Sequence, residues 1–226
     1  MVERLKFLSK TPKLRLASDA ALIVASALLL PAWAALAAGA IAYLYPALGT
    51  PRLALSYASA LALLVYHGEY LTPALALLVA WPLMTLLLGV KRMVVIEEWA
   101  YPPIFLALAF SLSLAYSEGG ISAPLFALVV YAVTREGFRV MAEGERREKV
   151  NVAAAATAGI VVQIAWVAHY LDYAAPYLAD LLATVWVALA YLLLEGMRRR
   201  MTPRVVLISA SAVATTFVLT ALSPLW

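Results

Sequence analysis

The stretch from Arg146 to Arg200 constrains the fold most, because about 45 mostly apolar residues lie there between two basic clusters. Two helices of about 20 residues fit between the clusters, each long enough to cross a hydrocarbon core of about 30 Å. The polar break at Asp172–Pro176 is the expected turn. Lys and Arg beside a span are retained in the cytoplasm, so we expect a helical hairpin with both ends inside and its tip outside.

Long apolar runs also fill most of the remaining chain. Hydrophobic residues make up 65% and charged residues 13%, whereas a soluble domain is about half apolar and a quarter charged. In lipid every backbone amide must be satisfied within its own structure, and continuous runs favour helices over a barrel. We therefore predict an all-α fold: a polytopic integral membrane bundle of about eight transmembrane helices, multi-pass in the cell membrane, with one domain over residues 16–226.

The N-terminal stretch leaves its topology open. Residues 1–15 carry five basic residues and are expected to form a cytoplasmic interfacial segment. Residues 16–47 are apolar but interrupted by Pro31, which allows one kinked span, a helical pair or a re-entrant hairpin. One span would place the basic N-terminus outside, against the positive-inside rule. Two helices would have about 15 residues each, short of a full crossing.

The later apolar runs give a consistent topology. They cover residues 53–66, 71–90, 101–117, 121–133 and 203–222. If the charged segment Arg135–Lys149 is inside, then Lys91–Glu98 and Arg52 are inside as well, and His67–Glu69 and Glu118 are outside. Every basic cluster from Arg52 onward then lies on one side, as expected for a multi-pass protein.

Charge and cysteine content restrict the partners. The net charge is +4 and no cysteine occurs. The basic residues lie in short clusters between spans, which indicates topology and contact with lipid headgroups rather than nucleic-acid binding. Absence of cysteine excludes disulfides and thiolate sites. The expected partners are the lipid bilayer and either other membrane subunits or further copies of this chain, with no nucleic acid.

Ionisable residues near the expected outer face form the first candidate group. They are His67, Glu69, His169, Asp172 and Asp180. Three interpretations stay open: polar residues of an aromatic interfacial belt, a pathway for a solute or protons, or a haem or divalent metal held by the two histidines. Their spacing matches no metal motif, so we assign no metal and leave the cofactor undetermined.

A second candidate group lies near the expected inner face and comprises Glu97, Glu98, Arg135 and Arg139. Arg135 follows an apolar run, so a partner such as Glu97, Glu98 or Glu195 would offset the cost of its burial. These side chains either form an ordinary charged rim or an inner gate.

Two families share features with the chain. The Glu97-Glu98 pair resembles that of the CAAX-type intramembrane proteases, but the following arginine is missing and only His169 lies downstream, so we set this resemblance aside. The layout, with Ala142-Glu-Gly and Leu194-Glu-Gly-Met-Arg, resembles the transmembrane coupling subunit of energy-coupling-factor importers, which implies docking on ATPase subunits. Both motifs lack that family's central arginine.

The sequence predicts a small membrane transport component, or permease, that moves a small solute or protons through a helical bundle. A membrane-embedded enzyme acting on lipid or polyprenyl phosphates is one alternative, and a non-catalytic subunit of a larger complex is another. No GxSxG, glycine-rich phosphate loop or DDxxD-like pair occurs, so no catalytic residue is assigned.

Overall fold

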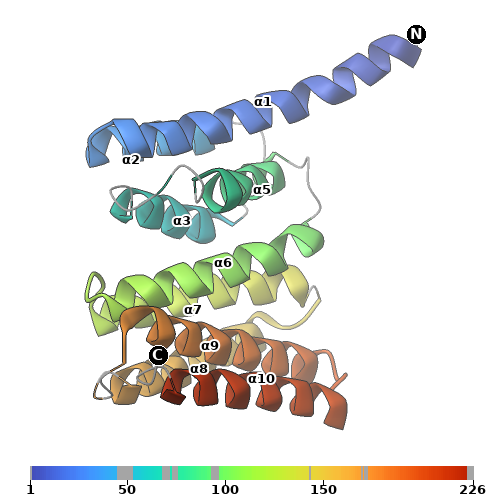
Figure 1. Cartoon of the computed structure of the whole chain (residues 1–226). Helices are drawn as coiled ribbons and strands as arrows, with labels where there is room; N and C mark the ends of the chain where they lie inside the picture. The colour runs from blue at the N-terminus through green and yellow to red at the C-terminus, as the bar shows by residue number, and fades with distance from the viewer. Residues whose placement is uncertain are drawn as a thin grey trace. The chain divides into compact units, whose positions relative to one another are not determined.

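The computed structural model describes residues 2–44, 53–67, 72, 76–92, 97–142, 144–168, 170 and 173–222, with the side chains of residues 2–14, 97 and 98 outside this description. Every regular element in these ranges is a helix, which confirms the all-α class for the described chain. The chain forms two compact units, an N-terminal unit of Met1–Ile104 and a C-terminal unit of Phe105–Trp226 (Figure 1). The expected single domain over residues 16–226 stays a prediction.

Four described helices are long and apolar enough to cross a membrane, and this is typical of a multi-pass membrane protein. They are Trp99–Ser117, Arg147–Ala168, Ala175–Met197 and Pro203–Leu222. Three shorter apolar helices, Ala32–Leu44, Ala54–Tyr66 and Ala76–Lys91, accompany them. The count of eight spans stays a prediction, because the shorter helices do not reach the length of a full crossing.

The N-terminal unit begins with two helices, α1 (Val2–Leu29) and α2 (Ala32–Leu44). The break falls at Pro31, whose ring and missing N–H end the first helix. The Pro31 carbonyl then accepts hydrogen bonds from the amides of Ala34 and Ala35, at 2.9 and 3.0 Å, and so starts the second helix. For residues 16–44 the structure has two helices rather than one kinked span, a form that both the helical pair and the re-entrant hairpin share. The basic residues before position 16 form the first part of α1.

α2 runs back along α1. The guanidinium of Arg92 forms an ion pair with Asp19 of α1 and also donates a 3.4 Å hydrogen bond to the carbonyl of Ala42, near the end of α2. One side chain can reach both helices only if the start of the apolar part of α1 lies near the end of α2. The first two helices therefore form a hairpin with its tip at Pro31.

The remaining helices of this unit are α3 (Ala54–Tyr66) and a continuous pair, the π-helical turn η1 (Ala76–Ala80) and α5 (Trp81–Lys91). The Trp81 indole donates a 2.9 Å hydrogen bond to the carbonyl of Ala17, while Arg92 reaches Asp19. Trp81 and Arg92 are about 16 Å apart along a helix axis, yet their partners are only two positions apart. α5 therefore crosses α1 steeply.

The C-terminal unit holds the residues of α6 (Glu97–Ser117) from Phe105 onward, followed by α7 (Ala123–Met141), α8 (Arg147–Ala168), α9 (Ala175–Met197) and α10 (Pro203–Leu222). α8 and α9 are the hairpin expected from the sequence. The Arg198 guanidinium contacts the Met141 carbonyl, with a 3.1 Å bond from its Nε, so the end of α9 lies at the end of α7. Both basic ends of the hairpin thus lie at one end of this unit.

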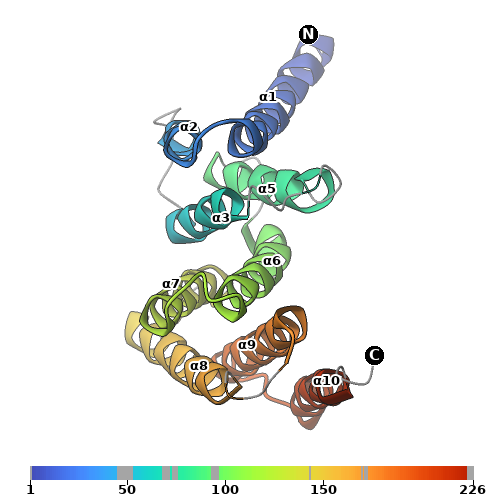
Figure 2. The ribbon, with the colours of Figure 1, turned by 60° about the vertical axis from the view of Figure 1, so that its left-hand side comes forward.

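The core of the C-terminal unit centres on Trp186, which is fully buried. Its ring makes edge contacts with Phe105 and Phe126, at centroid distances of 5.5 and 6.3 Å, and Phe126 stacks on Tyr116 at 4.6 Å. α10 lies against α9 (Figure 2), and only Ser209 and Thr220 of its described residues are buried. The centre of this unit is therefore a packed aromatic core. Among the helices of the C-terminal unit, α10 is the most exposed.

Candidate functional site

A group of charged residues lies inside the N-terminal unit, where the start of the apolar part of α1 meets the end of α5. The Arg92 Nη1 lies 2.6 Å from Asp19 Oδ2, and the two side chains are 11% and 25% exposed. A buried ion pair is retained only where its geometry offsets the loss of hydration. The short distance and the further bond to Ala42 provide that compensation on the arginine side.

Lys91 adds a second cation to this group. The residue is 5% exposed, and its Nζ lies 4.4 Å from the centre of the Tyr43 ring, a cation–π contact. Tyr43 stacks on Tyr57 at 4.6 Å, and the Tyr57 hydroxyl donates a 2.8 Å hydrogen bond to the carbonyl of Gly39. Within the described part of the chain, no carboxylate lies within ion-pair distance of Lys91.

We call Asp19, Tyr43, Tyr57, Lys91 and Arg92 the inner cluster, because the expected topology places it at the cytoplasmic side. With all groups in their charged forms, two cations and one carboxylate give a formal charge of +1. Charged side chains at membrane depth are costly and mark functional sites by default. An excess of positive charge beside tyrosine rings provides the surroundings in which a small anion is stabilised.

The expected outer group is only partly within the described structure. His67 ends α3, and its ring lies edge-on to Tyr66 at 4.8 Å. Asp180 is an exposed residue in the second turn of α9. The remaining members, Glu69, His169 and Asp172, lie outside the described residues. His67 and Asp180 belong to different units, and no three metal-binding side chains gather among the described residues.

The second group expected from the sequence, which differs from the inner cluster, is also not found as one site. Its members are Glu97, Glu98, Arg135 and Arg139. The Arg135 Nε donates a 2.7 Å hydrogen bond to Oδ1 of Asn151, so its partner is an amide of α8. Glu195, one of the carboxylates considered for it, lies 3.5 Å from Arg198 instead. Glu97 and Glu98 begin α6, but their side chains lie outside the described part.

Arg139 lies at a second, smaller site at the turn between α7 and α8. It lines a cavity of about 340 Å³ together with Glu145 and Arg147. Lys149 bonds to Glu145 at 3.0 Å, so this carboxylate is already paired. Arg139 and Arg147 have no ion-pair partner among the described residues, which leaves two cations at the cavity.

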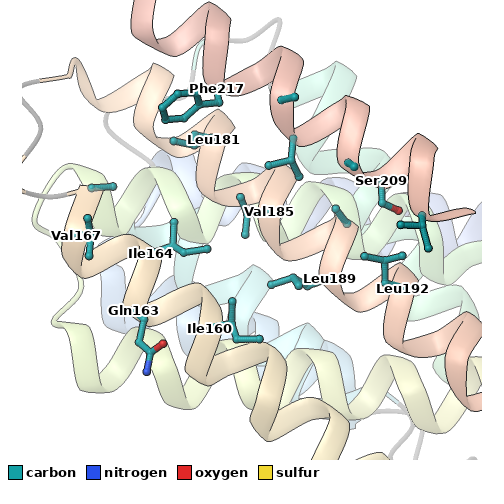
Figure 3. A pocket seen from close by; sticks show the side chains of 16 residues that line it. Ile160, Gln163, Ile164, Val167, Leu181, Val185, Leu189, Leu192, Ser209 and Phe217 are labelled. Carbon is teal, nitrogen blue, oxygen red and sulfur yellow. The ribbon is translucent and has the colours of Figure 1, made fainter.

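A larger groove runs between α8, α9 and α10 in the C-terminal unit (Figure 3). Its volume is about 770 Å³ and its lining is almost wholly apolar, with Gln163 and Ser209 as the polar exceptions. The Ser209 hydroxyl is buried and has no hydrogen-bond partner in the described structure. Sequence reasoning did not find this groove, because it depends on how far α10 stands from α8.

The turn between α9 and α10 carries the densest group of exposed arginines, Arg198–Arg200 and Arg204. The Arg200 amide bonds to the Glu195 carbonyl at 2.9 Å, and this closes α9 with Arg199 in the left-handed region at a φ of 56°. Glycine normally occupies this position. A side chain there costs about 1 kcal/mol or more, so the chain keeps an arginine where a glycine would be less strained.

The inner cluster was partly visible in the sequence. Asp19 lies near the start of an apolar run and Lys91-Arg92 at the end of another, and only the basic pair entered the sequence-based topology. The tyrosines were missed, since a tyrosine near the end of a span usually belongs to the interfacial belt. The one available signal was an acidic residue and a basic pair at the same expected face.

No protein-family model, no curated protein and no solved structure matches this chain.

Proposed function

We propose that this protein is a multi-pass component of a membrane transport system and that its N-terminal unit binds a small anionic solute. The observation that supports the proposal is the inner cluster, in which Lys91 and Arg92 lie beside Asp19, the one carboxylate that the described residues place there. Lys91 is 5% exposed and lies on the Tyr43 ring rather than beside a carboxylate. Replacing a buried charge by an apolar residue often costs little stability. The presence of Lys91 at this buried position therefore suggests a role other than stabilising the fold.

The cluster also suggests how a solute would bind. An anion entering beside Lys91 would neutralise the excess charge and would compete with Asp19 for the Arg92 guanidinium. Release of Asp19 would weaken the contact between α1 and α5, to which this ion pair contributes together with the Trp81 bond to Ala17. Solute binding and helix movement would thereby be coupled, as alternation between two states requires.

The residues selected from the sequence are not needed for this proposal. His67, Glu69, Glu97 and Glu98 belong to the N-terminal unit, whereas Arg135, Arg139, His169, Asp172 and Asp180 belong to the C-terminal unit. Their assignment to an outer and an inner group stays a prediction. The bond from Arg135 to Asn151 suits a structural role in joining α7 to α8.

Flux measurements in proteoliposomes test the proposal directly. The purified full chain is reconstituted and assayed for uptake of chloride, phosphate and acetate, with internal pH followed by a trapped dye. We expect flux of at least one anion, lost in Lys91→Gln and in Arg92→Gln and retained in the control Arg146→Gln, an exposed arginine between α7 and α8. Flux that is unchanged in both cluster variants would overturn the assignment of the site.

A second candidate is a membrane-embedded enzyme that acts on lipid or polyprenyl phosphates. The cavity of about 340 Å³ beside Arg139 and Arg147 favours it, because two unpaired cations at the end of a helical bundle suit a phosphate group. Phosphate release from a polyprenyl phosphate by the purified protein, lost in Arg139→Gln, would support this alternative. A protein with neither flux nor hydrolysis would be a non-catalytic subunit.

A further inference from the structure

We infer that the groove between α8, α9 and α10 binds an anionic phospholipid, with a hydrocarbon chain in the groove and the phosphate at the α9–α10 turn. This site lies in the C-terminal unit, so it is independent of the anion site proposed above. The inference depends on three features: the apolar lining, the arginines at one end of the groove, and the absence of ion-pair partners for three of those arginines among the described residues.

The groove suits a hydrocarbon chain. α8 and α10 both pack on α9 and leave about 770 Å³ between them. Phe217 and Leu181 lie toward one end and Leu192 and Ser209 toward the other, so the space follows the helices (Figure 3). Polar side chains on its walls are almost absent, and an apolar cavity does not hold ordered water. An acyl chain suits such a space, in which the Ser209 hydroxyl is the one buried polar side-chain group among the described lining residues.

The arginines stand at the same end of the groove as Leu192. Arg204 precedes the lining residue Val206 by two positions, or about 3 Å along the axis of α10. α9 ends at Met197, about 8 Å along the helix axis beyond Leu192, and the Arg200 amide bonds back to the Glu195 carbonyl at 2.9 Å. A phosphate attached to a chain in the groove therefore comes within reach of long arginine side chains.

These arginines are available for a ligand. Arg198 already contacts the Met141 carbonyl and Glu195. Arg199, Arg200 and Arg204 are exposed and have no ion-pair partner among the described residues. Arginine binds phosphate through a planar fork of donors, and basic sites between helices on the cytoplasmic side bind lipid headgroups.

Charge also argues against a second copy of this chain as the occupant. A symmetric dimer through the groove would bring the same patch of each copy together. Three unpaired arginines from each copy would then approach one another, and like charges at an interface oppose association. A lipid phosphate instead supplies the negative charge that this end of the groove lacks.

Native mass spectrometry of the purified full chain tests the inference. Delipidated protein in a neutral detergent is titrated with phosphatidylglycerol and, separately, with phosphatidylcholine carrying the same acyl chains. We expect phosphatidylglycerol to be retained preferentially, and the preference to fall about tenfold or more in Arg200→Gln/Arg204→Gln. The matched control, Arg15→Gln/Arg146→Gln, removes the same charge at two exposed positions outside the α9–α10 turn and should keep the preference.

A second pair of variants tests the groove itself. Ala210→Phe/Ala214→Phe places two rings in the groove from the exposed helix α10, whereas Ala212→Phe lies on α10 outside the lining. The first should lose retention of both lipids and the second should keep it. Equal retention of the two lipids by the parent protein would overturn the inference. A preference for phosphatidylglycerol that is unchanged in Arg200→Gln/Arg204→Gln would also overturn it. A dimer of the parent protein that is lost only in Ala210→Phe/Ala214→Phe would overturn it as well.

Discussion

The indole Nε1 of Trp186 donates a 2.8 Å hydrogen bond to the Thr134 hydroxyl, and this bond joins α9 to α7 inside the C-terminal unit. Both residues are buried, with exposed fractions of 0% and 1%. Thr134→Val keeps the shape but leaves the indole N–H without an acceptor. We expect a loss of about 1 kcal/mol in the free energy of unfolding. Unfolding in detergent measures it, with Thr215→Val on the exposed face of α10 as a control that should change little.

The ion pair between Asp19 and Arg92 gives the second prediction, for the N-terminal unit. Asp19→Asn removes the carboxylate that lies 2.6 Å from the mostly buried Arg92 guanidinium. We expect a loss of about 2–3 kcal/mol, because breaking one side of a buried pair leaves an uncompensated charge. The double variant Asp19→Asn/Arg92→Gln should recover part of this loss in a double-mutant cycle. A loss in the double variant equal to the sum of the two single losses would show that the two residues are not coupled.

Gly39 gives the third prediction, because α2 and α3 approach closely there. A Cβ added at this glycine would lie 2.5 Å from both Cδ atoms of Leu61, which is 6% exposed. Gly39→Ala should therefore cost about 1–3 kcal/mol, since a packed neighbour must move. Adding Leu61→Ala should relieve the clash, so the double variant is expected to be more stable than the sum of the single losses. Gly159→Ala on α8, where a Cβ meets no atom within 4 Å, is the control.

Much of the helical layout could be predicted from the sequence, and the reason is physical. The segment from Arg146 to Arg200 became α8 and α9, because basic ends, apolar length and a polar break together leave one arrangement. Pro31 marked the end of α1 for a local reason, its missing N–H. In each case the signal lies within a few residues of the feature that it predicts.

The contacts within the inner cluster could not be predicted, because they join positions far apart in the chain. Asp19 and Arg92 are 73 positions apart, and nothing local shows that α5 crosses α1 steeply. The same limit applies to Arg135, for which a carboxylate was the expected partner and Asn151 is the observed one. Asn151 was overlooked because its neutral amide carries no charge that would mark it as a partner for an arginine. It lies on α8, opposite Arg135 of α7.

Arg199 gives the fourth prediction. Its φ of 56° places a residue that carries a Cβ where helix ends favour glycine. Arg199→Gly should raise the free energy of unfolding in neutral detergent by about 1 kcal/mol, because it removes a steric penalty from the folded backbone. Arg200→Gly, at a neighbouring position outside the left-handed region, should not stabilise the protein. If both changes have the same effect, charge rather than backbone strain accounts for it.

The fifth prediction concerns topology and uses the absence of native cysteine. Single cysteines at Arg146 and Arg200 should resist a membrane-impermeant maleimide added to intact cells, because basic ends of spans are retained inside. Cysteines at Glu118 and Tyr170 should react, since they follow α6 and α8 at the opposite ends of those helices. Lysis should expose all four positions and serves as the control. Opposite labelling at positions 146 and 200 would contradict the hairpin, and with it the assignment of the α9–α10 arginines to the inner leaflet. A cysteine at Arg15 should be protected together with those two, because α1 and α2 form a pair that returns the chain to the side on which it began.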